Sequence, residues 1–126
     1  MARQIITTAN APSSPLYSQG VKAGPHVLVS GMAGIDPQTG SLVETTIQSQ
    51  TRQALANCQA VLEAAGATLD DVLEVGVLLT NPADFPGLNE EYARWFPSKP
   101  PTRYVAKLGV DLPGLLVSIR MTAFIG

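Results

Sequence analysis

The sequence predicts an α+β protein in which one mixed β-sheet carries two helices packed on one face. Two segments with the periodicity of amphipathic helices, 46–65 and 84–95, support this fold class. They alternate with short runs rich in Val, Ile and Leu that are typical of strands, at 27–30, 72–80, 102–108 and 115–124. Two helices are too few for a doubly wound sheet, so one face would be bare in a monomer and oligomerisation would cover it.

The segment 46–65 shows the clearest helical pattern in the chain. Its apolar and small residues recur at steps of three and four, at Ile47, Thr51, Ala54, Leu55, Cys58, Val61, Leu62 and Ala65. Polar residues fill the positions between them, and Gly66 supplies a helix stop. Because Cys58 falls on the apolar face, we expect a small buried hydrophobic residue there rather than a nucleophile.

Proline and glycine residues mark the boundaries of the remaining elements. Two prolines and several small polar residues predict an extended loop over 9–20. The strand at 27–30 is expected to end at Gly31. The segment 36–40 has turn chemistry, because an Asp precedes a proline and the closing glycine can adopt positive φ. A second turn is predicted at 111–114, before the last strand.

Length and composition restrict the classes of function that the protein can have. The 126 residues fit a single domain, 1–126, with a core that needs no metal or disulfide. Eight Lys and Arg against ten Asp and Glu give a net charge of -2, which argues against non-specific nucleic-acid binding. Only 14% of residues are charged and 45% are apolar, which indicates that some surface is hidden in an oligomer.

Few residues in the chain could hold a metal or form a catalytic triad. Cys58 is the only cysteine, which excludes an intrachain disulfide and a cysteine-cluster metal site. His26 is the only histidine, so a His-based metal site or triad within one chain is nearly excluded, and we expect His26 to be exposed. The sequence also lacks the common phosphate-loop and hydrolase motifs, and we expect neither metal nor cofactor.

Targeting signals are also missing from the sequence. The N-terminus has no apolar core of signal-peptide length, and no stretch approaches the apolar run needed to span a bilayer. The expected compartment is therefore the cytoplasm, with no membrane partner.

Arg103 is the most suggestive candidate for binding chemistry. It follows a Pro-Pro-Thr sequence and opens an apolar strand, so its backbone is expected to be rigid. A guanidinium can hold a carboxylate by two parallel hydrogen bonds, which fix orientation as well as supply charge. The alternative is a surface ion pair with one of the ten acidic residues.

Cationic and aromatic residues are interleaved around Arg103. The cations Arg94, Lys99 and Lys107 lie close to it in the sequence, among four aromatic residues. Such a mixture could form an RNA-binding patch. The helical spacing of the aromatics favours the alternative, in which they are core or interface residues and the lysines are solvated.

Several short motifs together resemble one known family. They are Ala11-Pro12, Pro15-Leu16-Tyr17-Ser18-Gln19-Gly20, Val29-Ser30-Gly31, Asp36-Pro37-Gln38-Thr39-Gly40, Asp84-Phe85 followed by Asn89, and Pro101-Thr102-Arg103. An Ala-Ala-Gly also ends the long helical segment. Their order and spacing over essentially the whole chain resemble the RidA/YjgF/UK114 family.

The resemblance implies a fold, an assembly and an activity. The fold is chorismate-mutase-like, and the assembly is a homotrimer with three clefts between subunits. The implied activity is cofactor-free hydrolysis of 2-imino and enamine acids, typically 2-aminoacrylate and 2-iminobutanoate, to 2-oxo acids and ammonia. In the family the arginine that matches Arg103 binds the substrate carboxylate, and residues matching Tyr17, Ser30, Gly31 and Asn89 line the cleft. Within this motif, ligand binding by Arg103 is favoured over a surface ion pair.

The sequence departs from the family pattern at three positions. Val105 stands where typical deaminases of the family carry a cysteine, and Ser118 stands where they carry a glutamate that positions the attacking water. A hydroxyl can hold water but is a poor base near neutral pH. Arg120 occupies a second, commonly acidic position. If it faces the cleft it would favour a more anionic ligand, and its alternative is an interfacial or surface ion pair.

Two rival functions stand beside imine hydrolysis. The first is a non-catalytic trimer that binds a small carboxylate, because the acid and the cysteine are missing. The second is RNA cleavage, an activity also attributed to the family. The acidic charge balance and the lack of paired histidines argue against RNA cleavage.

Overall fold

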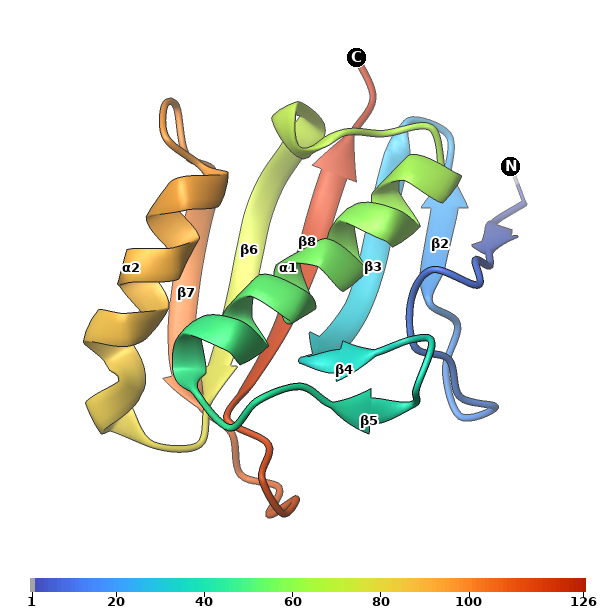
Figure 1. Ribbon diagram of the computed structural model, residues 1–126. Helices are drawn as coiled ribbons and strands as arrows, with labels where there is room; N and C mark the ends of the chain where they lie inside the picture. Colours follow the sequence, from blue (N-terminus) through green and yellow to red (C-terminus); the bar gives the residue numbers. More distant parts are fainter. Residues whose placement is uncertain (1) are drawn as a thin grey trace.

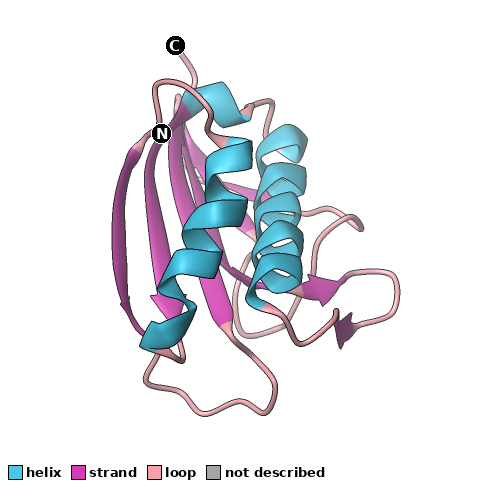
Figure 2. Cartoon of the chain, turned by 60° about the vertical axis from the view of Figure 1, so that its left-hand side comes forward, coloured by secondary structure: helices cyan, strands magenta, loops and turns pink. Residues whose placement is uncertain are grey.

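The computed structural model describes residues 2–126 and contains one mixed sheet with two helices against one face (Figure 1, Figure 2). The helices are α1 Ile47–Ala64 and α2 Phe85–Trp95. The six strands of the sheet are β1 Gln4–Ile6, β2 Gly20–Ala23, β3 His26–Ala33, β6 Val72–Leu79, β7 Thr102–Lys107 and β8 Val117–Phe124. The α+β class with a single helix layer is confirmed. None of the helices within residues 2–126 is long and apolar enough to cross a membrane.

The strand order is β1-β2-β3-β8-β6-β7, which places the C-terminal strand near the centre of the sheet. Strand β8 runs antiparallel to both of its neighbours, β3 and β6. Strand β7 is an edge strand and runs parallel to β6. A parallel pair needs a crossover connection, and α2 supplies it. As a result, α2 lies beside the edge strand β7 (Figure 1).

The two faces of the sheet are chemically different, as β8 shows. Val117, Ile119, Met121 and Ala123 are fully buried beneath the helices. The alternate residues, which include Ser118 and Arg120, point to the opposite face, as period-two alternation requires. Ser118 and Arg120 therefore share a face, as predicted, and it is the face without helices.

The long helix α1 forms where its periodicity predicts it. The Thr46 hydroxyl caps it by accepting a hydrogen bond from the Ser49 amide at 3.2 Å. Gly66 has a φ of 84°, the left-handed conformation that ends many helices. Cys58 is fully buried on the face that packs on the sheet, and its Sγ donates to the Ile119 carbonyl at 3.3 Å. Burial raises the pKa of this thiol to about 12, so it is no nucleophile near neutral pH.

The predicted turns at 36–40 and 111–114 are confirmed. Gly40 has a φ of 74° and donates its amide hydrogen bond to the Asp36 carbonyl at 2.8 Å. This turn joins the short strands β4 Ile35–Asp36 and β5 Ser41–Leu42, which form a separate ribbon. Gly114 has a φ of 78° in the second turn. Both turns thus use glycine in the left-handed region that other residues avoid.

Most predicted boundaries lie within one residue of the structure, but two are wrong and four short strands were missed. Strand β3 does not end at Gly31: it continues to Ala33 through an irregularity in its pairing with β8. A β-bulge carries the strand past the glycine. The last strand begins at Val117 rather than Leu115, because the Gln50 side chain binds this segment as a loop, accepting from the Leu116 amide. The strands β1, β2, β4 and β5 were not predicted.

Candidate functional site

Arg103 lies on β7 and points toward α2. Its partner in the neighbouring strand is Val75, which is fully buried on the helix-covered face, so Arg103 shares that face. Its Nη1 donates a hydrogen bond to Asn89 Oδ1 at 2.8 Å. Its guanidinium carbon lies 4.8 Å from the ring centroid of Tyr92 and 5.8 Å from that of Phe85. The amide and the two rings hold the guanidinium in a fixed orientation.

Within residues 2–126 the charge of Arg103 has no acidic partner. No carboxylate of residues 2–126 lies within 4.0 Å of it, and its hydrogen-bond partner is a neutral amide. The alternative of an ion pair with an acid of the same chain is therefore wrong. A half-buried guanidinium without a counter-charge favours an anionic ligand.

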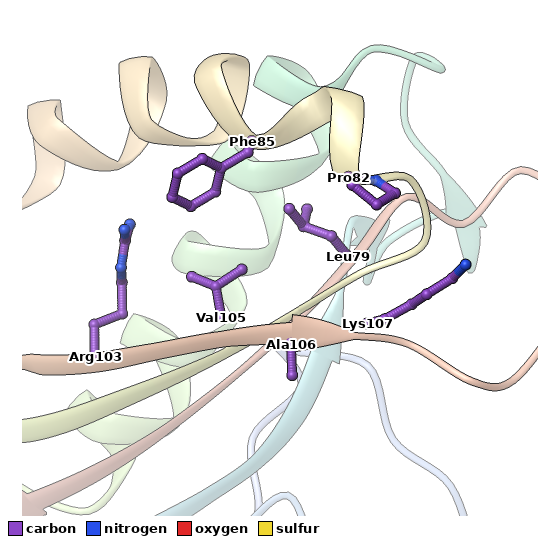
Figure 3. A pocket seen from close by; sticks show the side chains of 7 residues that line it. All are labelled: Leu79, Pro82, Phe85, Arg103, Val105, Ala106 and Lys107. Atoms are coloured by element: carbon purple, nitrogen blue, oxygen red, sulfur yellow. The ribbon is translucent and has the colours of Figure 1, made fainter.

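The guanidinium lies at one end of a pocket of about 570 Å³, which we call the Arg103 pocket (Figure 3). Phe85 from α2 and Val105 from β7 form its apolar walls between helix and strand (Figure 3). The other lining residues are Leu79, Pro82, Ala106 and Lys107. Val105 thus contributes shape to the pocket and no titratable group.

Tyr17, Gly31 and Ser118 line a second hollow of about 270 Å³, which we call the Tyr17 hollow. Strands β3 and β8 bring Gly31 and Ser118 together: a Cβ on Gly31 would lie 2.9 Å from Ser118 Oγ. A larger residue at position 31 would displace the hydroxyl. The glycine therefore leaves room for the Ser118 hydroxyl in the hollow.

Ser30 has a structural contact that sequence reasoning did not anticipate. Its hydroxyl donates to the Ser18 carbonyl at 2.6 Å, and its amide donates to the Gln19 carbonyl at 2.9 Å. Ser30 lines a third hollow, together with Arg3 and Arg120, rather than the Tyr17 hollow. In a single chain Ser30 fixes the segment that carries the tyrosine and does not lie in the same hollow as Gly31.

Gln19 supports the same segment and was missed from the sequence. It is buried, its side-chain nitrogen donates to the carbonyls of Thr8, Ala11 and Pro12, and its side-chain oxygen accepts from the Thr8 amide. These bonds hold the loop before β2 against the domain. A glutamine in a polar loop gives no sequence signal of burial, so only its place next to the Tyr17 motif could have indicated this function.

Arg120 forms an ion pair, which is the second of the two roles considered for it from the sequence. Its Nη1 lies 3.4 Å from Glu74 Oε1, and its Nη2 donates to Thr122 Oγ1 at 2.9 Å. It lies on the helix-free face of the sheet and does not line the Arg103 pocket. Within one chain its charge is thus partly balanced by an acid.

Tyr92 is a further residue of the Arg103 neighbourhood that the sequence did not single out. The sequence predicts a core aromatic, and Tyr92 is indeed buried, with its ring centroid 4.9 Å from that of Phe96. Burial raises the pKa of its hydroxyl, while the charge of Arg103 acts in the opposite direction. Its spacing of three residues from Asn89 places both on the helix face toward β7, which is the only sequence signal for its position.

The predicted site residues form two separate groups in one chain. Arg103, Asn89 and Val105 lie on the helix-covered side at the β7 edge, whereas Ser118 lies on the other side of the sheet. Neither the Arg103 pocket nor the Tyr17 hollow is lined by His, Asp or Glu. In the part of the chain that the structure describes, no three His, Cys, Asp or Glu residues gather as metal ligands would. One chain therefore presents a guanidinium on one side of the sheet and the Ser118 hydroxyl on the other.

Comparison with known proteins places this geometry in a family. A family model described as Endoribonuclease L-PSP matches residues 8–125. A RutC family protein of Pyrococcus horikoshii is 40% identical, with 97% of this chain and 98% of that protein covered. The human 2-iminobutanoate/2-iminopropanoate deaminase is 34% identical over 100% of this chain and 93% of its own length.

Solved structures agree with the sequence relatives. A conserved Rid-family protein from Yersinia pestis superposes with a TM-score of 0.91 at 36% identity, covering 98% of this chain and 100% of its own. The fold and the family match thus define an α+β protein of the Endoribonuclease L-PSP class. The chain belongs to the RidA/YjgF/UK114 family, which includes imine deaminases.

Proposed function

We propose that the protein hydrolyses reactive 2-imino and enamine acids of the 2-aminoacrylate and 2-iminobutanoate type to 2-oxo acids and ammonia. The single observation that carries this proposal is the oriented guanidinium of Arg103, which has only a neutral amide as its hydrogen-bond partner. A bidentate pair with the substrate carboxylate would supply the missing counter-charge. The deaminase name of the human relative supports the reaction class.

The active unit in this proposal is a homotrimer with its sites between subunits. The Arg103 pocket and the Tyr17 hollow open on different sides of one sheet, so a single chain presents two half-sites. A cleft that joins the Arg103 pocket of one subunit to the Tyr17 hollow of the next would contain both. The helix-free face of the sheet would provide the contact surface, because it exposes Leu28, Tyr104 and Phe124.

The chemistry needs little from the protein beyond positioning. With the carboxylate held by Arg103, the planar substrate presents C2 to water in a shielded cleft. An enamine acid first gains a proton at C3 and loses one from nitrogen, which gives the imine. Water oxygen then bonds to C2 and gives up a proton, while the electrons of the C=N bond move to nitrogen and nitrogen takes up a proton. The resulting carbinolamine expels ammonia as its hydroxyl loses a proton and the C=O bond forms. Because the substrate nitrogen is itself basic, hydroxyls such as those of Ser118 and Tyr17 need only hold the water.

The test is release of 2-oxo acid and ammonia from freshly generated 2-iminobutanoate. Wild-type protein is expected to accelerate the reaction over buffer, and Arg103→Ala is expected to lose at least about tenfold in kcat/KM, since it removes a charged hydrogen-bonding group. Arg94→Ala is the matched control, because Arg94 is exposed at the end of α2 and does not line the pocket. No acceleration by the wild type would reject the enzyme.

A non-catalytic trimer that binds small carboxylates is the second candidate. It is favoured by one observation: neither half-site is lined by a carboxylate or histidine that could act as a general base. This function predicts that a 2-oxo acid binds through Arg103 without any turnover of the imino acid. If this is the function, wild type should be inactive and Ser118→Glu should gain activity. If the protein is a working deaminase, wild type is already active.

A further inference from the structure

The Arg103 pocket contains a second cation, Lys107, at its far end. Both residues lie on β7 and pair with buried residues of β6, Arg103 with Val75 and Lys107 with Leu79, so both face the helix layer. Four strand residues span about 13 Å between their Cα atoms. Figure 3 shows the two side chains at opposite ends of the pocket, with Val105 between them along the strand.

Neither cation is neutralised within the part of the chain that the structure describes. No acid lines the pocket, and within residues 2–126 neither Arg103 nor Lys107 has a carboxylate within 4.0 Å. Asp84 precedes the lining residue Phe85 in the sequence and forms no ion pair either. Arg103 is half-buried and Lys107 is exposed, so water screens the charge of Lys107 more strongly than that of Arg103. Both charges still attract anionic groups to the two ends of the pocket.

The middle of the pocket is apolar. Phe85, Leu79, Pro82 and Val105 separate the two charges. A short monocarboxylate at Arg103 would leave Lys107 without a partner and much of the 570 Å³ empty. A ligand with an anionic group at each end and methylenes between them would match the full length of the pocket, and the flexible four-carbon stem of Lys107 can adjust to its second charge.

We propose that Lys107 determines specificity, and that the preferred substrates are 2-imino acids with a second carboxylate at the end of the side chain. This inference rests on the proposed function, because Arg103 must hold the 2-carboxylate. Lys107 then binds the distal carboxylate, and Phe85 and Val105 pack against the methylenes. The acids that fit are those with the carbon skeletons of glutamate and 2-aminoadipate, and the longer skeleton spans more of the distance.

Binding of two acids of equal chain length isolates the distal charge. 2-Oxoadipate and 2-oxohexanoate differ only in the terminal carboxylate, and calorimetry measures both without any turnover. Wild type is expected to bind 2-oxoadipate about fivefold more tightly, in the range of an exposed ion pair. Lys107→Met should abolish this preference, so that the two acids bind with equal affinity, while Lys107→Arg should retain it. Lys99→Met removes the same charge outside the pocket and should keep the preference.

The outcomes separate this inference from the proposed function. Equal affinity for the two acids, or a preference that survives Lys107→Met, would overturn the role of Lys107 and leave the function of Arg103 intact. Failure of wild type to bind either acid would reject the carboxylate site, and the specificity proposal with it. Hydrolysis of the two corresponding imino acids should follow the same order, with the effect of Lys107→Met confined to the KM of the diacid.

Discussion

At the scale of single residues, the partner of Arg103 decides what this arginine can bind. Asn89 accepts its hydrogen bond at 2.8 Å and orients it, but contributes no negative charge. Tyr92 supports the guanidinium from the face of its ring. An acid in place of the amide would form the same contact and also neutralise the charge. The neutrality of Asn89 is therefore as important for ligand binding as its position.

The variant Asn89→Asp tests this argument directly. The new carboxylate would pair with Arg103 and compete with the substrate carboxylate, so KM for the imino acid should rise by about tenfold or more. Stability should be unchanged or slightly higher, because an ion pair replaces a neutral hydrogen bond. Thermal unfolding and steady-state kinetics measure both effects. Asn10→Asp, at an exposed position, is the control and should leave KM unchanged; an unaltered KM for Asn89→Asp would contradict the model.

At the scale of elements, α1 and α2 are joined by an ion pair around Glu91. Glu91 is buried and accepts hydrogen bonds from Arg52 Nη2 at 3.1 Å and from Trp95 Nε1 at 3.0 Å. Burial alone would raise the pKa of the Glu91 carboxyl. The hydrogen bonds from Arg52 and Trp95 outweigh burial, and the net pKa lies below the ordinary value of 4.5. Because α2 carries Asn89 and Tyr92, this pair also supports the position of the Arg103 pocket.

Glu91→Gln should therefore destabilise the protein in a pH-dependent way. A carboxyl whose pKa is lower in the folded than in the unfolded state stabilises the fold at pH values above the unfolded-state pKa. This stabilisation is lost as the pH falls through the folded-state pKa. Wild type should exceed Glu91→Gln by roughly a few degrees in Tm at pH 7. The difference should shrink below about pH 4.5. Thermal unfolding between pH 3 and 7 measures it, with the exposed Glu90→Gln as control; a difference independent of pH would refute the charge-based explanation.

The elements also show which parts of the fold a sequence can predict. Helix α1 was predictable because its cap, its apolar spacing and Gly66 are all local signals. Strands β1 and β2 were not, because their few residues have no alternation and are defined by pairing, β1 with β2 and β2 with β3. Position 20 of β2 needs a glycine because the strand passes close to α1 there. A Cβ at this position would lie 2.6 Å from the side chain of Val61. Such a contact is long-range and leaves no local pattern.

The residues of the candidate site also divide into those with a local sequence signal and those defined by long-range contacts. Arg103 and Ser118 could be named from motifs that are local in sequence. The bond of Ser30 to Ser18 and the support of the loop by Gln19 depend on the fold and could not. The lack of an acid to neutralise the Arg103 pocket could not be predicted either, because the sequence does not show which cation each of its ten acidic residues pairs with. Alternation within the predicted strand already puts Lys107 on the same face as Arg103, but the pairing of β7 with β6 was needed to show that this face is the helix-covered one.

At the scale of the whole molecule, the separation of the half-sites predicts an obligate assembly. The helix-free face of the sheet exposes the apolar side chains of Leu28, Tyr104 and Phe124, with exposed fractions of 46%, 44% and 39%. The Tyr104 ring lies close to Gly76, where a Cβ would meet it. An apolar sheet face of this kind is suited to contact with other copies of the chain.

Mixed assemblies test whether one site draws on two subunits. Arg103→Ala removes the carboxylate anchor, and Gly31→Leu fills the Tyr17 hollow; each variant alone should be inactive. Because Gly31 is exposed and only Ser118 Oγ is close to it, the leucine should leave the fold intact. In a trimer assembled at random from equal amounts of both variants, about a quarter of the clefts would combine two intact half-sites.

Co-expression of the two variants is therefore expected to restore about a quarter of the wild-type activity on 2-iminobutanoate, with sedimentation confirming the trimer. If both half-sites acted within one chain, every chain in the mixture would carry one defect and no activity would return. A monomer in sedimentation, or a mixture as inactive as its components, would refute the shared cleft. Recovery in the mixture can come only from a cleft in which Arg103 of one subunit lies opposite Gly31 of another.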